Sequence, residues 1–265
     1  MGGGLSPRIH TQTWLPDGEA RASVVIAHGA GEHLGRYEHV AARLNAEGYA
    51  VHALDHRGHG RSEGPRALID RIDNAVEDLD QLVVKVADGQ PVFLLGHSMG
   101  GTIALKYAIA HQERLVGLVL SSPLAALEAA SPATRLAARV LSAAAPRLGV
   151  IAVDASAVSR DPEVVRAYET DPLVHHGKLP ARTVAELASA VESFPATVGA
   201  ITVPTLIMYG TADQLVPPEG SAMLGQRIGS ADKTVKPYNG LYHEILNEPE
   251  QQQVLDDLVE WLRTH

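Results

Sequence analysis

The segment Gly96-His97-Ser98-Met99-Gly100 has the spacing G-x-S-x-G and stands between a short apolar run and a longer helical pattern. The apolar run is Pro91 to Leu95, and a helix is predicted over Met99 to His111. A strand that turns directly into a helix strains the residue at the turn, and only small neighbours permit the close approach. The Ser98 hydroxyl would then stand at a helix N-terminus, where developing negative charge is favoured. This context favours a serine nucleophile over a glycine-rich turn without a chemical role.

A serine hydroxyl needs a general base within hydrogen-bond reach and a third group that orients the base. After such an elbow, the acid and then the histidine follow the serine, each beyond a later strand. Asp213 follows the apolar run Thr205 to Tyr209, and His243 lies between the last predicted strand and the last helix. We predict Asp213 as the acid and His243 as the base. A solvated turn aspartate and a surface histidine are the alternatives, and Asp232 and Asp171 fit the order less well.

Acyl transfer also needs hydrogen-bond donors aimed at the oxyanion of the tetrahedral intermediate. The backbone N–H of Met99, directly after the serine, is one candidate. The other comes from the loop His28-Gly29-Ala30-Gly31-Glu32-His33, which follows a strand predicted over Ser23 to Ala27. The glycines of this loop permit a close approach to the site. We expect the N–H of Ala30 to be the second donor.

Six histidines between positions 28 and 59 raise the question of a metal site, because imidazole is a common zinc ligand. The spacing argues against one, since H-E-x-x-H is absent and no paired histidines precede Asp55-His56. The run Asp55 to Ser62 is better explained as the turn after the second core strand. There it would pack against the loop 28–33, and its polar groups would make structural hydrogen bonds. We predict no metal ligand.

The elements that must position these residues follow from a regular alternation of short apolar runs with longer amphipathic segments. Strict alternation is typical of an α/β fold with a mostly parallel central sheet and helices on both faces. Between positions 123 and 200 the alternation stops, and alanine-rich, proline-interrupted helical segments without a convincing buried strand indicate an inserted helical cap. We therefore predict a core in two parts, 1–122 and 201–265, and a cap at 123–200. The predicted elements are strands at 23–27, 49–54, 91–95, 115–120, 205–209 and 233–236, and helices at 36–47, 73–87, 99–111, 219–228 and 253–262.

Composition excludes several classes of protein. The chain has 265 residues, a net charge of −9 and no cysteine, which argues against nucleic-acid binding, a disulfide framework and a thiol nucleophile. No apolar stretch is long enough for a membrane span, and no secretory signal is apparent. We expect a cytoplasmic location. Gly2 and Ser6 match a loose N-myristoylation pattern, for which a flexible leader is the alternative.

Together these motifs resemble the monoacylglycerol lipase group of the α/β-hydrolase superfamily. G-H-S-M-G alone indicates only the superfamily, whereas the loop after the first strand and the cap segment narrow the group. The resemblance covers nearly the whole chain. The motifs that carry it are H-G-A-G-E-H at 28–33, D-H-R-G-H-G-R-S at 55–62, G-H-S-M-G-G at 96–101, Tyr168 with T-D-P-L at 170–173, and G-L-Y-H-E at 240–244.

The resemblance implies a serine hydrolase that cleaves monoacylglycerols to glycerol and a free fatty acid through an acyl-enzyme, without a cofactor. It implies that Ser98, His243 and Asp213 form the triad and that Ala30 and Met99 donate to the oxyanion. The glycerol end of the substrate would meet a polar niche, and the acyl chain would run under the cap. Structural ion pairs that merely clasp the loop are the alternative for that niche. The niche residues implied are Glu32, Arg36, His97 and Tyr168.

Other activities remain open on the same scaffold, because one fold hosts many chemistries. A general small-ester carboxylesterase or a lysophospholipase-like hydrolase is the main alternative, and acyl transfer to another alcohol or ligand binding without turnover are further ones. Peripheral membrane contact through the apolar segment Leu124 to Val153 is an alternative to its packing on the core. The chain also departs from the group at His175, where vertebrate members carry a cysteine. We expect no thiol-directed inhibition there.

Overall fold

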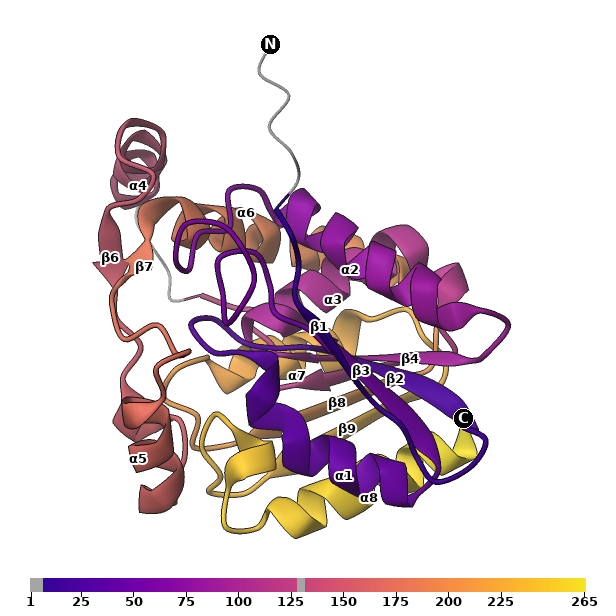
Figure 1. The fold of residues 1–265 in the computed structure, drawn as a ribbon. Coiled ribbons are helices and arrows are strands. Elements are labelled where there is room, and N and C mark those ends of the chain that lie inside the picture. Colours follow the sequence, from indigo (N-terminus) through magenta and orange to yellow (C-terminus); the bar gives the residue numbers. More distant parts are fainter. Residues whose placement is uncertain (1–6, 128–131) are drawn as a thin grey trace.

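A central seven-stranded sheet organises the chain, of which the computed structural model describes residues 7–127 and 132–265 (Figure 1). Its strand order is β1-β3-β2-β4-β5-β8-β9, in which only β1 runs antiparallel to its neighbour. Gly2 and Ser6 lie outside the described residues. The strands are β1 Thr11–Trp14, β2 Ala22–Ala27, β3 Tyr49–Leu54, β4 Val92–His97, β5 Gly117–Ser121, β8 Thr205–Gly210 and β9 Lys233–Tyr238.

Helices cover both faces of this sheet (Figure 1). On one face, α1 (Glu38–Ala46) and α8 (Gln251–Thr264) bury Val40, Leu44 and Leu258 against it. The other face is covered by four helices that share one buried apolar cluster with the sheet. These are α2 Ile72–Ala87, α3 Met99–His111, α6 Ala181–Thr197 and α7 Pro218–Arg227.

The predicted α/β architecture is confirmed, and the predicted core strands and helices are present with shifts of only a few residues at their ends. The four strands β2, β3, β4 and β5 are buried along their whole length, which explains why their sequences are continuous apolar runs. One strand of the central sheet was not predicted. It is the edge strand β1, whose short sequence T-Q-T-W alternates between exposed and half-buried side chains.

Residues 122–204 connect β5 to β8 and contain the segment for which a helical cap was predicted. Its helices are α4 (Pro132–Ala144), α5 (Pro162–Thr170) and α6. The segment also contains a small antiparallel pair, β6 (Gly149–Ile151) with β7 (Leu179–Pro180), which the sequence pattern did not reveal. In contrast to α4, which projects beyond the sheet in Figure 1, α6 packs on α2 and α3 and belongs to the core cluster. No helix among the described residues is long and apolar enough to cross a bilayer.

The turn between β4 and α3 tolerates no side chain at Gly100. A Cβ on Gly100 would lie 2.0 Å from the carbonyl oxygen of Ala27, which is backbone and cannot rotate away. A Cβ on Gly199, in contrast, would have no neighbour closer than 3.7 Å. Neither glycine has a positive φ, so the two positions differ in space rather than in backbone strain.

We predict that Gly100→Ala lowers the free energy of unfolding by about 3 kcal/mol or more, because the tightly packed turn must move. The matched change Gly199→Ala should stay within about 1 kcal/mol of the original protein. Urea unfolding followed by circular dichroism measures both. Equal midpoints for the two variants would show that the strand–helix turn is less tightly packed than described.

Candidate active site

Ser98 occupies a strained position at the junction of β4 and α3. Its φ of 53° and ψ of −119° lie in a region where residues other than glycine are rarely found. The surrounding backbone holds this conformation: the Ser98 N–H donates to Ser121 O at 3.1 Å, and Leu124 N–H donates to Ser98 O at 3.0 Å. The predicted elbow is therefore present, and Ser98 lines a cavity at the carboxyl end of the sheet.

His243 and Asp213 form a buried hydrogen-bonded pair at the same cavity. His243 Nδ1 lies 2.7 Å from Asp213 Oδ2, and both side chains are almost completely buried. The other carboxylate oxygen, Oδ1, accepts from the backbone N–H groups of Leu215 and Val216 at 2.8 and 2.9 Å. Because a carboxylate accepts only, Nδ1 carries the proton and Nε2 is the nitrogen left to take a proton from a serine.

The two residues meet because the loops after β8 and β9 pack closely. A Cβ on Gly210, at the end of β8, would lie 2.3 Å from the carbonyl oxygens of both Leu241 and Tyr242. Ala212 N–H also donates to Leu241 O at 3.0 Å. Gly210 thus permits the close approach of the two loops that places the Asp213 carboxylate beside His243. The alternative acids are engaged elsewhere, since Asp171 bonds His33 and Asp232 bonds His265.

The pKa of His243 is raised above its ordinary value of 6.5. Burial alone would lower this pKa, but the charge of Asp213 and its hydrogen bond outweigh burial. The carboxylates of Glu244 and Glu32 raise the pKa further. His243 can therefore hold a proton that it has accepted, which suits a general base that later acts as an acid.

The two predicted oxyanion donors lie on the walls of this cavity. Met99 is the first residue of α3, so its N–H has no acceptor within the helix. Ala30 also lines the cavity, and its N–H makes no hydrogen bond to any part of the chain that the structure describes. Two free amides beside Ser98 can stabilise an oxyanion there.

The loop 28–33 is held by the turn after β3, as predicted for the run 55–62. His28 accepts from the N–H of His56 at 3.0 Å through Nε2, while its Nδ1 bonds Gly29 O at 2.7 Å. Asp55 accepts from the N–H groups of Leu34 and Arg61, both at 2.8 Å. The His28 ring therefore has a structural role, whereas both ring nitrogens of His56 are buried without a hydrogen-bond partner among the described residues. Within residues 7–127 and 132–265, no cluster of three or more histidine, aspartate or glutamate side chains could hold a metal ion.

The cavity around Ser98 has a volume of about 210 Å³, with apolar walls and a polar end. A larger cavity of about 1000 Å³ adjoins it, lined mainly by apolar residues of α4, α6 and the loop after β8. The polar end is formed by Glu32, His97, Tyr168 and Glu244. The two cavities share the apolar residues Leu124, Leu127, Ile151, Val184 and Leu215.

Arg36 does not line the cavity, although the resemblance placed it in the polar niche. Its guanidinium is buried behind the polar end, where it bonds Glu32 at 2.8 Å and Glu244 at 2.5 and 2.7 Å. It also lies 4.8 Å from the ring centroid of Tyr168. The two carboxylates raise the pKa of Arg36 against the effect of its burial. In this structure, Arg36 therefore forms the structural ion pairs that were the alternative to a place in the glycerol niche.

The remaining niche residues do reach the cavity. Glu32 accepts from Gly29 N–H at 2.6 Å and from the Tyr37 hydroxyl at 2.7 Å, and the Arg36 charge lowers its pKa to about 2 against the effect of burial. His97 bonds Ser121 O at 3.0 Å through Nδ1, and burial lowers its pKa to about 4, so it is neutral. The Tyr168 hydroxyl is buried without a hydrogen-bond partner among the described residues.

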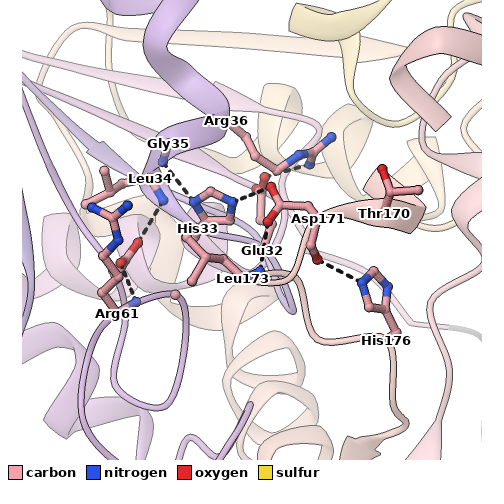
Figure 2. A network of polar contacts seen from close by, with 12 residues as sticks. Glu32, His33, Leu34, Gly35, Arg36, Arg61, Thr170, Asp171, Leu173 and His176 are labelled. Atoms are coloured by element: carbon pink, nitrogen blue, oxygen red, sulfur yellow. Dashed lines mark hydrogen bonds and ion pairs between the residues drawn. The ribbon is translucent and has the colours of Figure 1, made fainter. Parts of the chain in front are cut away.

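The connection between β5 and β8 is fastened to the loop after β2. Figure 2 shows His33 pointing at Asp171, with 2.8 Å between Nε2 and Oδ2. His175, the residue that departs from the family pattern, donates its backbone N–H to Gly31 O at 2.7 Å. Because Gly31 follows Ala30, this fastening also holds the predicted oxyanion donor in place.

Glu244 is the residue of this site that sequence reasoning missed. It is buried, lines the cavity and makes a two-point contact with Arg36, 208 positions earlier in the chain. The available signal was an acidic residue directly after the predicted base, in a loop that also carries Asn247. Asn247 donates to Glu244 Oε2 at 2.9 Å and so supports the carboxylate.

Comparisons with known proteins agree on one family. A family model described as serine aminopeptidase, S33, matches residues 18–250. A monoacylglycerol lipase of Mycolicibacterium smegmatis is 47% identical, over 97% of this chain and 94% of its own. A monoglyceride lipase of Homo sapiens is 40% identical, over 89% and 79% of the two chains. The crystal structure of a Paleococcus ferrophilus monoacylglycerol lipase superposes with a TM-score of 0.89 at 33% identity, covering 97% of this chain and 99% of that one.

The raised pKa of His243 predicts the acid side of the pH–rate profile. His243 must be neutral to act as a base, so kcat/KM should fall as the pH drops through a value above 6.5. Asp213→Asn removes the charge that raises this pKa most, so the acid limb should move to lower pH and the rate should fall by about 10⁴-fold.

Profiles of kcat/KM on a water-soluble p-nitrophenyl ester measure this shift. Asp171→Asn is the matched control, because Asp171 bonds His33 and not His243. An acid limb that stays in place in Asp213→Asn, or that moves equally in both variants, would contradict the pairing of Asp213 with His243.

Proposed function

The chain belongs to the serine aminopeptidase S33 family of hydrolases, and we propose that it hydrolyses monoacylglycerols to glycerol and a free fatty acid. The observation that carries this proposal is one cavity that joins Ser98, the His243–Asp213 pair, a polar end and apolar walls. Relatives named monoacylglycerol lipase and monoglyceride lipase support the substrate class. No cofactor takes part in the proposed reaction.

In the first step, Ser98 Oγ attacks the ester carbonyl while Nε2 of His243 takes the serine proton. The N–H groups of Ala30 and Met99 donate to the oxyanion that forms. Because Asp213 accepts from Nδ1–H, it stabilises the imidazolium of His243 without taking its proton. The imidazolium then gives its proton to the leaving glycerol oxygen, and the acyl group remains on Ser98.

In the second step, a water molecule loses a proton to His243 and attacks the acyl-enzyme. The same two amides stabilise the second oxyanion. Proton return from His243 to Ser98 Oγ releases the fatty acid and restores the starting state. Each proton therefore passes through Nε2, which is free because Nδ1 bonds Asp213.

The shape of the two cavities supports a small polar alcohol joined to one long apolar chain. Carboxylates and the free Tyr168 hydroxyl at the polar end can bond glycerol hydroxyls. The adjoining apolar cavity extends away from Ser98 between α4 and α6 and can receive the acyl chain. Residues 123–200 act in this proposal as a cap over the site, with 1–122 and 201–265 as the core.

We also propose peripheral contact of this cap with lipid, with the cytoplasm as the location. Of the seven large apolar side chains that are exposed in the described residues, four lie in the connection between β5 and β8. Two of them, Leu127 and Ile151, line the larger cavity, which a monoacylglycerol would enter. The exposed side chains are Leu127, Val140, Leu148 and Ile151.

The experiment compares the rates of hydrolysis of mono-, di- and triacylglycerol with the same medium-length acyl chain. We expect strong preference for the monoester, since the polar end has room for a small alcohol. In Ser98→Ala the rate should fall by about 10⁴-fold or more, while thermal unfolding shows a folded protein.

Two outcomes would contradict the proposal. If Ser98→Ala hydrolysed the monoester as fast as the original protein, Ser98 could not be the nucleophile. Comparable rates on all three lipids would favour the general carboxylesterase or lysophospholipase-like alternative.

A further inference from the structure

The polar end of the cavity contains two carboxylates, Glu32 and Glu244. Both glutamates are buried, at 3% and 5% exposure. No lysine or arginine is among the described residues that line the cavity. His97 is neutral because burial lowers its pKa to about 4.

The nearby cation, Arg36, is turned away from this space. Three hydrogen bonds tie its terminal nitrogens to the two carboxylates, and the ring of Tyr168 lies 4.8 Å from its central carbon. Two carboxylates and one guanidinium leave a net negative charge at the polar end. A bound head group therefore meets the carboxylates rather than the arginine.

The carboxylates can still accept hydrogen bonds from a ligand. A carboxylate has about four lone-pair positions, and the contacts of Glu32 and Glu244 with the protein use three on each. Tyr168 adds a hydroxyl without a partner among the described residues. Neutral hydroxyls and protonated amines can donate into this arrangement. A carboxylate or a doubly ionised phosphate cannot donate a hydrogen bond, and any ionised phosphate would be repelled at close range.

We infer that the polar end selects acyl esters of neutral or cationic alcohols and rejects esters of anionic alcohols, and that Glu244 sets this selectivity. The inference rests on the proposed hydrolysis of monoacylglycerols and narrows its substrate class. Glu244 is the carboxylate to vary, since Glu32 also holds the loop of Ala30 through Gly29 and Tyr37.

The test uses three esters of octanoic acid with the same acyl chain below their aggregation concentrations. They are 1-octanoylglycerol, 1-octanoylglycerol 3-phosphate and 2-(dimethylamino)ethyl octanoate, which is cationic at pH 7 and cannot transfer its acyl group to nitrogen. We expect kcat/KM for the neutral and the cationic ester to exceed that for the phosphate by about 100-fold or more in the original protein.

Variants assign the selectivity to the charge of Glu244. In Glu244→Gln the ratio of neutral to phosphate ester should fall by about tenfold, because one of two carboxylate charges is lost. Glu244→Asp keeps the charge and should keep the ratio within about threefold. Asp256→Asn is the matched control. Asp256 lies on α8 and pairs with Arg43 of α1 at the surface, so the loss of its negative charge should leave the ratio unchanged. Each ratio is measured within one variant, so a change in stability affects both substrates alike.

The outcomes separate this inference from the proposed function. Absence of turnover of 1-octanoylglycerol in the original protein would contradict the proposed function itself. Equal turnover of the neutral and the phosphate ester, or an unchanged ratio in Glu244→Gln, would overturn the inference while the monoacylglycerol hydrolysis stands. The comparison within the original protein keeps the inference testable even if Glu244→Gln does not fold.

Discussion

The guanidinium of Arg36 holds together three segments that are distant in the chain. It bonds Glu32 in the loop after β2 and Glu244 in the loop after β9, and it packs on Tyr168 of α5. The first loop carries the proposed oxyanion donor, the second carries His243, and α5 belongs to the cap. Breaking one partner of a buried ion pair costs about 3–5 kcal/mol, because a charge is left uncompensated. Arg36 therefore links the oxyanion donor, the base and the cap, beside the His33–Asp171 and His175–Gly31 contacts that also fasten the cap to the loop after β2.

The parallel sheet brings the rest of the site to the same place. The loops after β2, β4, β8 and β9 leave the carboxyl ends of parallel strands, where ligand sites of such sheets form. Close packing then sets the details, as the backbone contacts around Gly100 and Gly210 show. Ser98 is held at a positive φ by its neighbours, so the strain of the elbow is balanced by the surrounding core.

Local patterns predicted much of this arrangement, because buried strands and amphipathic helices leave periodic signals. They also predicted Asp213 and His243 as partners, since both follow strands in the expected order, and the structure places them 2.7 Å apart. Three features could not be predicted locally. The edge strand β1 is short and half exposed, the β6–β7 pair is joined across a long connection, and the Arg36–Glu244 contact spans 208 positions. Such features depend on tertiary pairing, which a single sequence does not display.

The most direct test is a crystal structure of the protein inactivated with glyceryl p-nitrophenyl octylphosphonate. Ser98 Oγ displaces p-nitrophenolate from phosphorus, so the octyl chain and the glycerol ester stay attached and imitate the tetrahedral intermediate. We expect phosphorus bonded to Ser98 Oγ, with an oxygen that accepts from the N–H groups of Ala30 and Met99. Glycerol hydroxyls should contact Glu32 and Glu244, while Arg36 stays behind them. Attachment to another residue, or Arg36 turned into the cavity to bind glycerol, would contradict the account.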